Sequence, residues 1–137
     1  MIHIFIDTDI ILDLLGDRKP FSRFALQIFN RSGKILSLHT SGNSITIAYY
    51  ILCKYTNETN ARRLILNLLD YLNVIPVTTS ILTKAFKSNF KDVEDAVQHF
   101  CALTNQEIKY LVTRNLKDYK HSQIEVLNSE DLIRFLG

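Results

Sequence analysis

The stretch HIFIDTDIILDLLGDR, residues 3–18, decides the fold class of this chain. Residues 2–6 form a short run rich in β-branched side chains, which predicts a buried strand. Apolar residues at helical spacing follow and end at Gly16, which predicts a short helix. Asp7 and Asp9 stand between these two elements. Because a buried carboxylate is costly unless it is paired, acids at the tip of an apolar strand indicate a functional site.

The alternation of strand and helix patterns continues along the rest of the chain. Further strands are predicted over residues 35–38, 73–77, 109–113 and 124–127, and helices over 21–33, 44–55, 61–72, 80–86, 90–105 and 129–137. Strands separated by helices predict a parallel sheet that is covered on both faces. We therefore expect one α/β domain over residues 1–137, a three-layer α/β/α sandwich with a central parallel sheet of four to five strands. The first strand should be central and adjacent to 109–113, and Pro76 predicts a free sheet edge.

The composition is that of an ordinary globular domain. The chain has 137 residues, of which 47% are hydrophobic and 22% charged, with a formal net charge of +2. Cys53 and Cys101 fit no Cys-x-x-Cys spacing, so we expect buried thiols in a reducing compartment. No apolar run approaches the roughly 18 residues of a membrane span, and the N-terminus lacks a signal-peptide pattern. These features predict a cytoplasmic protein with no membrane partner.

The charges are unevenly distributed. Between Asp17 and Glu58 there is no acidic residue, whereas basic residues occur at 18, 19, 23, 31, 34 and 54. A local basic field beside an acidic cluster suits a nucleic-acid partner. We therefore consider Arg18, Lys19 and Arg23 as candidate RNA-binding residues, with a solvated helix face as the alternative.

Polar residues follow two of the predicted strands. Asp7 lies just past the strand at 2–6, and Thr113, Asn115 and Asp118 end or follow the strand at 109–113. In open parallel sheets, functional groups gather outside the carboxyl ends of the strands. We therefore expect Asp7 and Asp118 to face one crevice, with Asp9 either capping the short helix or lining the site.

A second acidic group lies in the segment KDVEDAVQHF, residues 91–100. Asp92 and Asp95 are three residues apart, so they share one face of the predicted helix, with His99 one turn further along. Asp92 is also a good N-cap, and Asp95 stands where the partner of a capping box falls. Carboxylates that share a cleft repel one another unless a cation is present. Oxygen ligands without a cysteine or histidine cluster suit Mg²⁺ or Mn²⁺, which can activate water against a phosphodiester.

Three segments resemble the PIN domain family, in the small form found in toxin–antitoxin ribonucleases. They are FIDTDIILDLL (5–15), FKDVEDAVQHFCA (90–102) and YLVTRNLKDY (110–119). The resemblance covers essentially the whole chain and implies a metal-dependent endonuclease for single-stranded RNA, often dimeric and inhibited by an antitoxin. It assigns catalytic and metal-binding roles to Asp7, Asp95 and Asp118. Under this hypothesis Thr113 and Asn115 orient the last acid.

The chain departs from the family pattern at one position. The family usually carries another acid, often Glu, on the helix after the second strand, but SGNSITIAYYIL (41–52) has none. Thr46, Ile47 or Tyr49 stands at or near that position, and Asp92 or Asp9 is a candidate replacement as a metal ligand. The missing acid also supports a PIN-like module that binds RNA or protein without cleaving.

A second enzyme hypothesis is a phosphatase similar to the haloacid dehalogenases. The D-T-D sequence at 7–9 resembles the nucleophile and acid pair of that family. Ile11 stands where that family places Thr or Val, and no Gly-Asp motif follows the third strand. These departures favour the nuclease.

Overall fold

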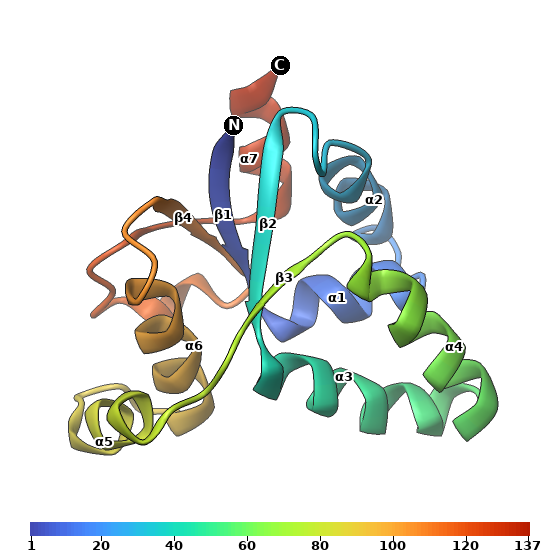
Figure 1. The fold of residues 1–137 in the computed structure, drawn as a ribbon. Helices are drawn as coiled ribbons and strands as arrows, with labels where there is room; N and C mark the ends of the chain where they lie inside the picture. Colours follow the sequence, from blue (N-terminus) through green and yellow to red (C-terminus); the bar gives the residue numbers. More distant parts are fainter.

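The computed structural model describes residues 1–137 and shows a parallel sheet flanked by helices (Figure 1). The strands are β1 (Ile2–Ile6), β2 (Leu36–Ser41), β3 (Asn73–Ile75), β4 (Ile108–Val112) and β5 (Glu125–Leu127). The helices are α1 (Thr8–Leu15), α2 (Ser22–Asn30), α3 (Gly42–Tyr55), α4 (Glu58–Leu69), α5 (Thr79–Lys87), α6 (Val93–Leu103) and α7 (Ser129–Leu136), with a short 3₁₀ helix η1 (Leu116–Tyr119). None of the helices has the length and apolar character that crossing a membrane requires.

The sheet has five strands in the order β3-β2-β1-β4-β5, and every pairing is parallel. Strand β1 lies at the centre, with Ile4 opposite Leu38 on β2 and Tyr110 on β4. The predicted central position of residues 2–6, adjacent to β4, is therefore confirmed. Strand β3 is an edge strand, as Pro76 directly after it predicts.

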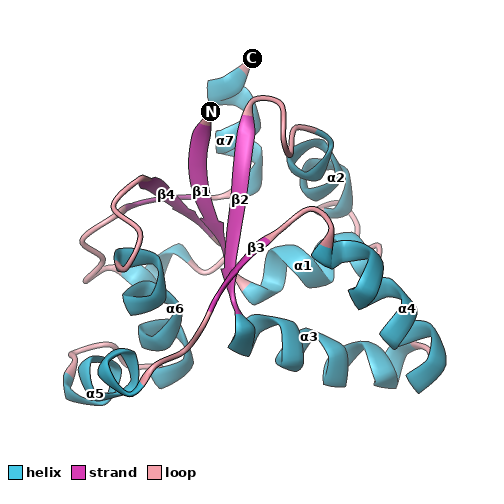
Figure 2. Ribbon diagram, viewed as in Figure 1, coloured by secondary structure: helices cyan, strands magenta, loops and turns pink.

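Two hydrophobic cores fill the space on either side of the sheet. Alternate β1 residues point to opposite faces, so Ile4 and Ile6 enter the first core and Phe5 enters the second. The first core is covered by α1 to α4 and α7, and the second by α5 and α6 (Figure 2). This is the predicted α/β/α sandwich. Of the two free cysteines, Cys101 is buried as expected, whereas Cys53 is only half-buried.

Side-chain caps set the helix starts and explain where the boundaries differ from the predictions. Helix α1 begins at Thr8 because Asp7, rather than Asp9, caps it. Helices α3 and α4 start earlier than predicted because Ser41 and Asn57 accept hydrogen bonds from backbone N–H groups of their first turns. Helix α6 starts later, at Val93, because Asp92 is its N-cap.

Candidate active site

A cleft of about 350 Å³ opens at the carboxyl ends of β1 and β4. Helix α1 supplies one wall, α3 and α6 supply others, and the segment after β4 closes it. Its lining residues are Asp7, Thr8, Asp9, Leu12, Arg18, Ile47, Ile51, Glu94, Asp95, Arg114 and Asn115. The parallel sheet thus brings the first and the late acidic segments together.

Asp7 is the most enclosed acid of the cleft, with 3% of its surface exposed. Its Oδ1 accepts a hydrogen bond from the backbone N–H of Thr8 at 2.8 Å and a longer one from Nε2 of Gln98 at 3.4 Å. Its Oδ2 accepts bonds from the hydroxyls of Thr113, at 2.8 Å, and Tyr119, at 3.1 Å. Burial raises the pKa of the Asp7 carboxyl despite these donors.

Asp95 on α6 meets Asp7 through the hydroxyl of Tyr119. This hydroxyl lies 3.1 Å from Oδ2 of Asp7 and 3.3 Å from Oδ1 of Asp95. A phenol has one proton to donate, so the second contact is favourable only if a carboxyl is protonated or its charge is balanced by a cation. Burial and then the charge of Asp7 raise the pKa of Asp95 to about 7. The pair therefore either shares a proton or has its charge balanced by a cation.

Asp9 extends this acidic group along α1. Its Oδ2 accepts a hydrogen bond from the backbone N–H of Arg114 at 3.0 Å and lies 3.3 Å from the Thr113 hydroxyl, whose one proton is donated to Asp7. Its buried Oδ1 has no hydrogen-bond partner. Burial, followed by the charge of Asp7, raises the pKa of Asp9 to about 7. The unpartnered oxygen and the nearby Asp7 charge suit a hard divalent cation such as Mg²⁺ or Mn²⁺. No group of three or more Asp, Glu, His or Cys residues is close enough together in this structure to hold such an ion by itself.

Glu94 is a cleft residue that the sequence reasoning missed. It lines the cavity from the first turn of α6, and burial followed by the charge of Asp7 raises its pKa. Helix α3 presents Ile47 and Ile51 to the same cavity. Glu94 is thus an additional acid in a cleft to which α3 contributes only apolar side chains. Its position next to Asp95 was the available signal.

Gln98 was also missed, although it lies three residues after Asp95 and shares its helix face. The side chain is fully buried, and its Nε2 donates to the hydroxyl of Thr8 at 3.2 Å and to that of Ser44. Its Oε1 accepts a hydrogen bond from the Ser41 hydroxyl. Gln98 therefore links α6 to the starts of α1 and α3, the helices that carry the cleft.

His99, expected on the acidic face of α6, lies elsewhere. Its ring packs 4.9 Å from that of Phe90 in the second core, and Nε2 accepts the backbone N–H of Gln123 at 3.0 Å. Burial lowers the pKa of His99 to about 4, so the ring is neutral. The expectation was wrong because the helix turns its Gln98 side, rather than its His99 side, toward Asp7.

Asp92 and Asp118 lie at the margin. The Asp92 carboxylate is occupied with the helix start, accepting from the N–H groups of Glu94 at 2.8 Å and Asp95 at 3.3 Å. Asp118 is exposed on η1, near enough for its charge to raise the pKa of Asp95. Thr113 donates to Asp7, so it orients the first acid rather than the last one.

The candidate RNA-binding residues have different surroundings. Arg18 lines the cleft, and its Nε pairs with buried Asp13 at 3.0 Å. Asp13 also pairs with Arg114 at 3.1 Å, so this buried acid is shared by two arginines. Lys19 and Arg23 are exposed and lie outside the residues that line the cleft. Asn115 is exposed at the cleft edge.

The chain belongs to the PIN domain family, whose model matches residues 3–117. The match favours the nuclease class over the phosphatase alternative. No curated protein matches the chain significantly.

Solved structures share the fold at low sequence identity. VapBC-1 from nontypeable Haemophilus influenzae is 17% identical, with a TM-score of 0.68 and coverage of 93% of this chain and 98% of that one. A toxin–antitoxin complex from Klebsiella pneumoniae is 22% identical, with a TM-score of 0.66 and coverage of 92% and 97%. VapC20 from Mycobacterium tuberculosis, described as a sarcin–ricin loop cleaving toxin, is 16% identical, with a TM-score of 0.63 and coverage of 79% and 86%.

Proposed function

We propose that this protein is a metal-dependent endoribonuclease that cleaves single-stranded RNA and acts as the toxin of a toxin–antitoxin pair. The observation that carries the proposal is the meeting of Asp7 and Asp95 at one Tyr119 hydroxyl, beside an open cleft. Membership of the PIN family and the description of VapC20 as a sarcin–ricin loop cleaving toxin support the reaction class.

The cleft acids would hold Mg²⁺ or Mn²⁺, with Asp7 and Asp95 as direct ligands and Asp118 acting through water from the edge. Asp9 and Glu94 adjoin the pair and add negative charge, whereas Asp92 serves mainly as a helix cap. When bound, such an ion polarises a phosphodiester and lowers the pKa of a coordinated water.

Other side chains would position the acids and the substrate. Thr113 and Tyr119 fix Oδ2 of Asp7 by hydrogen bonds. The guanidinium groups of Arg18 and Arg114 stand in the cleft wall and would contact phosphate oxygens. Lys19 and Arg23 are exposed residues that follow Arg18 in the sequence, and they would contact RNA phosphates outside the cleft. Asn115 would lie beside the substrate at the cleft edge.

The proposed partner is an antitoxin, as in the toxin–antitoxin complex from Klebsiella pneumoniae. A groove on the first-core side offers an apolar surface for it, lined by Leu14, Leu15, Leu26, Phe29, Leu64 and Leu68. Leu26 is half exposed there, which suits a partner's apolar helix face. We further propose a cytoplasmic location and a homodimer, by analogy with the family.

A PIN-like module that binds RNA without cleaving it is the second candidate. The observation in its favour is the apolar face of α3, where Ile47 and Ile51 line the cleft. With fewer metal ligands the protein would bind the ion weakly, and RNA binding without cleavage would be the activity that remains.

Incubation with mixed RNA in the presence of Mg²⁺, Mn²⁺ or EDTA tests the proposal. The wild type should cut only with metal, and Asp95→Asn should not cut. Asp70→Asn, a change at an exposed acid outside the cleft, is the matched control and should cut normally. Metal-independent cutting, or cutting by Asp95→Asn at the wild-type rate, would contradict the proposal, and tight RNA binding without any cutting would favour the second candidate.

A further inference from the structure

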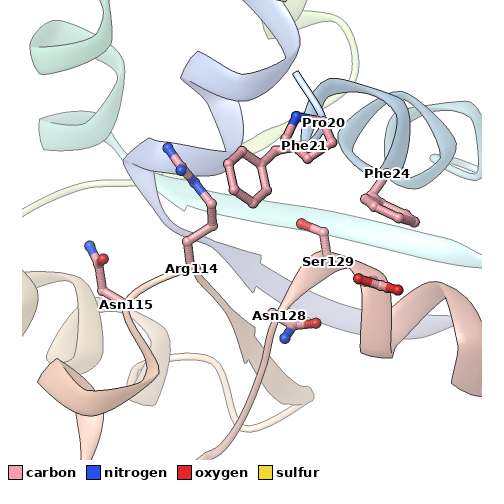
Figure 3. A pocket seen from close by; sticks show the side chains of 8 residues that line it. Pro20, Phe21, Phe24, Arg114, Asn115, Asn128 and Ser129 are labelled. Carbon is pink, nitrogen blue, oxygen red and sulfur yellow. The ribbon is translucent and has the colours of Figure 1, made fainter. Parts of the chain in front are cut away.

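We propose that a second pocket, between the start of α2 and the start of α7, binds one nucleobase of the RNA next to the cleavage site. The inference rests on the proposed function, because it assigns a base-binding subsite to the same substrate. The pocket has a volume of about 330 Å³ and is shown in Figure 3. A cavity of this size accommodates a small planar ligand.

The pocket adjoins the acidic cleft. Arg114 and Asn115 line both cavities, so they form the boundary between them. Arg114 is fixed on the cleft side by Asp13, and its backbone N–H donates to Asp9. An RNA chain whose phosphate lies at Asp7 therefore has this pocket within reach of a neighbouring nucleotide.

Aromatic side chains supply a stacking surface. Phe21 and Phe24 line the pocket from the start of α2, and Phe21 is 37% exposed. The Arg114 guanidinium lies over the Phe21 ring, 4.2 Å from its centre. Figure 3 shows these two side chains next to each other at the pocket. Single-stranded RNA is recognised by bases stacked on aromatic rings and guanidinium planes, which is the surface present here.

Two polar groups are free to read a base edge. Ser129 is only 6% exposed, and its buried Oγ has no hydrogen-bond partner although the residue lines the pocket. The Oδ1 of Asn128 caps α7, accepting from the N–H of Asp131 at 2.7 Å, while its amide nitrogen makes no hydrogen bond within the protein. A hydroxyl and an amide donor match the edges of nucleobases.

The unpaired Ser129 hydroxyl is the most specific of these observations. A buried hydroxyl without a partner destabilises the fold, because its hydrogen bonds with water are lost and not replaced. A ligand that forms a hydrogen bond with the Ser129 hydroxyl would replace the hydrogen bond lost to water. The pocket's one acid, Glu130, is paired with Arg134 at 3.1 Å, so a neutral planar ligand suits the site better than a cation.

The experiment uses the full chain carrying Asp95→Asn, which prevents cleavage and leaves the pocket intact. Ser129→Ala and Phe21→Ala are added to it singly, with Phe86→Ala on α5, an exposed phenylalanine outside both cavities, as the control. The ligands are a fluorescent RNA oligonucleotide that the wild type cuts and the same RNA with one abasic nucleotide at each position in turn.

We expect Phe21→Ala to weaken binding of the intact RNA by about 5- to 100-fold, in the range of a lost base stack. Removing the base at one position next to the cut should weaken RNA binding by the Asp95→Asn parent to a similar extent. With that abasic RNA, the parent and the Phe21→Ala variant should bind with equal affinity. Ser129→Ala should weaken binding through that same nucleotide while the melting temperature stays equal or rises, and Phe86→Ala should bind as the parent does.

Equal binding by the parent and both pocket variants across the abasic series would overturn the inference. A loss of antitoxin binding by these variants, with RNA binding unchanged, would also overturn it. The pocket would then hold a side chain of the antitoxin and not a nucleobase. Both results leave metal-dependent cutting by the unmodified protein unaffected, so they are distinguishable from failure of the proposed nuclease. If Phe21→Ala unfolds, Ser129→Ala alone decides, because it removes no hydrogen bond within the protein.

Discussion

At the scale of single residues, Asp7 combines burial with an excess of hydrogen-bond donors. Thr8, Thr113, Tyr119 and Gln98 surround its two oxygens and hold the carboxylate in one orientation. A buried acid at the end of the apolar strand β1 is tolerated because these four donors satisfy its oxygens. The donors keep Asp7 in place, while its charge raises the pKa of the neighbouring Asp9 and Asp95.

Asp7→Asn should abolish stabilisation by Mn²⁺ while the melting temperature of the metal-free protein stays equal or rises. The amide oxygen still accepts the N–H of Thr8. The relief of repulsion with Asp9 and Asp95 should offset the loss of the oxygen that accepts from Thr113 and Tyr119. Thermal melts with and without Mn²⁺ measure both effects. A much lower melting temperature without metal would mean that the acid is structural and would refute the ion-site interpretation.

Asp95→Ala should eliminate both cleavage and the Mn²⁺-dependent rise in melting temperature. Its carboxylate contacts only the Tyr119 hydroxyl, at a long 3.3 Å, so little stability of the metal-free fold depends on it. Cleavage rates and melting curves for this variant and Asp70→Asn provide the comparison. Retained cleavage would show that Asp95 is not a required ligand.

At the scale of elements, the acids at the start of α6 have different roles: Asp92 caps the helix, and Asp95 lines the cleft. Asp92→Ala should lower the free energy of unfolding by about 1 kcal/mol, because two backbone N–H groups lose their acceptor. Cleavage should remain substantial, since the Asp92 carboxylate points at the helix start. Denaturant unfolding and cleavage assays on the same preparation test this. Loss of cleavage at an unchanged stability would instead assign Asp92 to the metal site.

Helix α1 is joined to the segment after β4 by the buried Asp13. Asp13→Ala should lower the free energy of unfolding by about 1–3 kcal/mol, because Arg18 and Arg114 lose their shared partner. Burial raises the pKa of Asp13, and both arginines are partly exposed, which limits the loss. Denaturant unfolding at two salt concentrations measures it. A change below a few tenths of a kcal/mol would show that the arginines are satisfied by water.

At the scale of the whole molecule, the cleft acids should make the stability of the metal-free protein fall as pH rises from about 6.5 to 8. Asp95 and Asp9 have pKa values of about 7 when folded and a usual value of 3.8, so the folded state holds more protons. Their stabilisation is complete below the usual value and is lost as pH rises through about 7.

The pH window matters because His99 has the opposite effect at lower pH. Its folded pKa of about 4 lies below its usual 6.5, so it destabilises the fold only below about pH 6.5. Melting temperatures across the window, with and without Mn²⁺, test the prediction. Mn²⁺ should stabilise more at pH 8 than at pH 6.5, and Asp95→Asn should flatten the metal-free curve; a metal-free curve that rises with pH would contradict it.

Part of the site followed from the sequence and part did not. The position of Asp7 at the carboxyl edge of the sheet was predictable from the strand pattern. Asp95 reaches the same edge because the helix before β4 runs opposite to the parallel strands, so its start lies where β1 ends. Glu94 and Gln98 were not identified, because which side chains near Asp95 enter the cleft depends on the angle at which α6 packs against the sheet. The sequence does not specify that angle. Whether each proposed ligand binds a metal stays a prediction.

The sequence by itself determined the order of the elements, the parallel sheet with β1 at its centre, and the acids at its carboxyl edge. The order of the elements follows from local hydrophobic periodicity. The central position of β1 followed from the expectation that Asp7 and the polar residues after β4 share one crevice. Only the tertiary structure decided that Tyr119 lies between Asp7 and Asp95, that Asp13 pairs with two arginines, and that Ser129 is left without a partner. The physical reason is that such contacts join side chains from separate elements, and their distances depend on how the helices pack against the sheet.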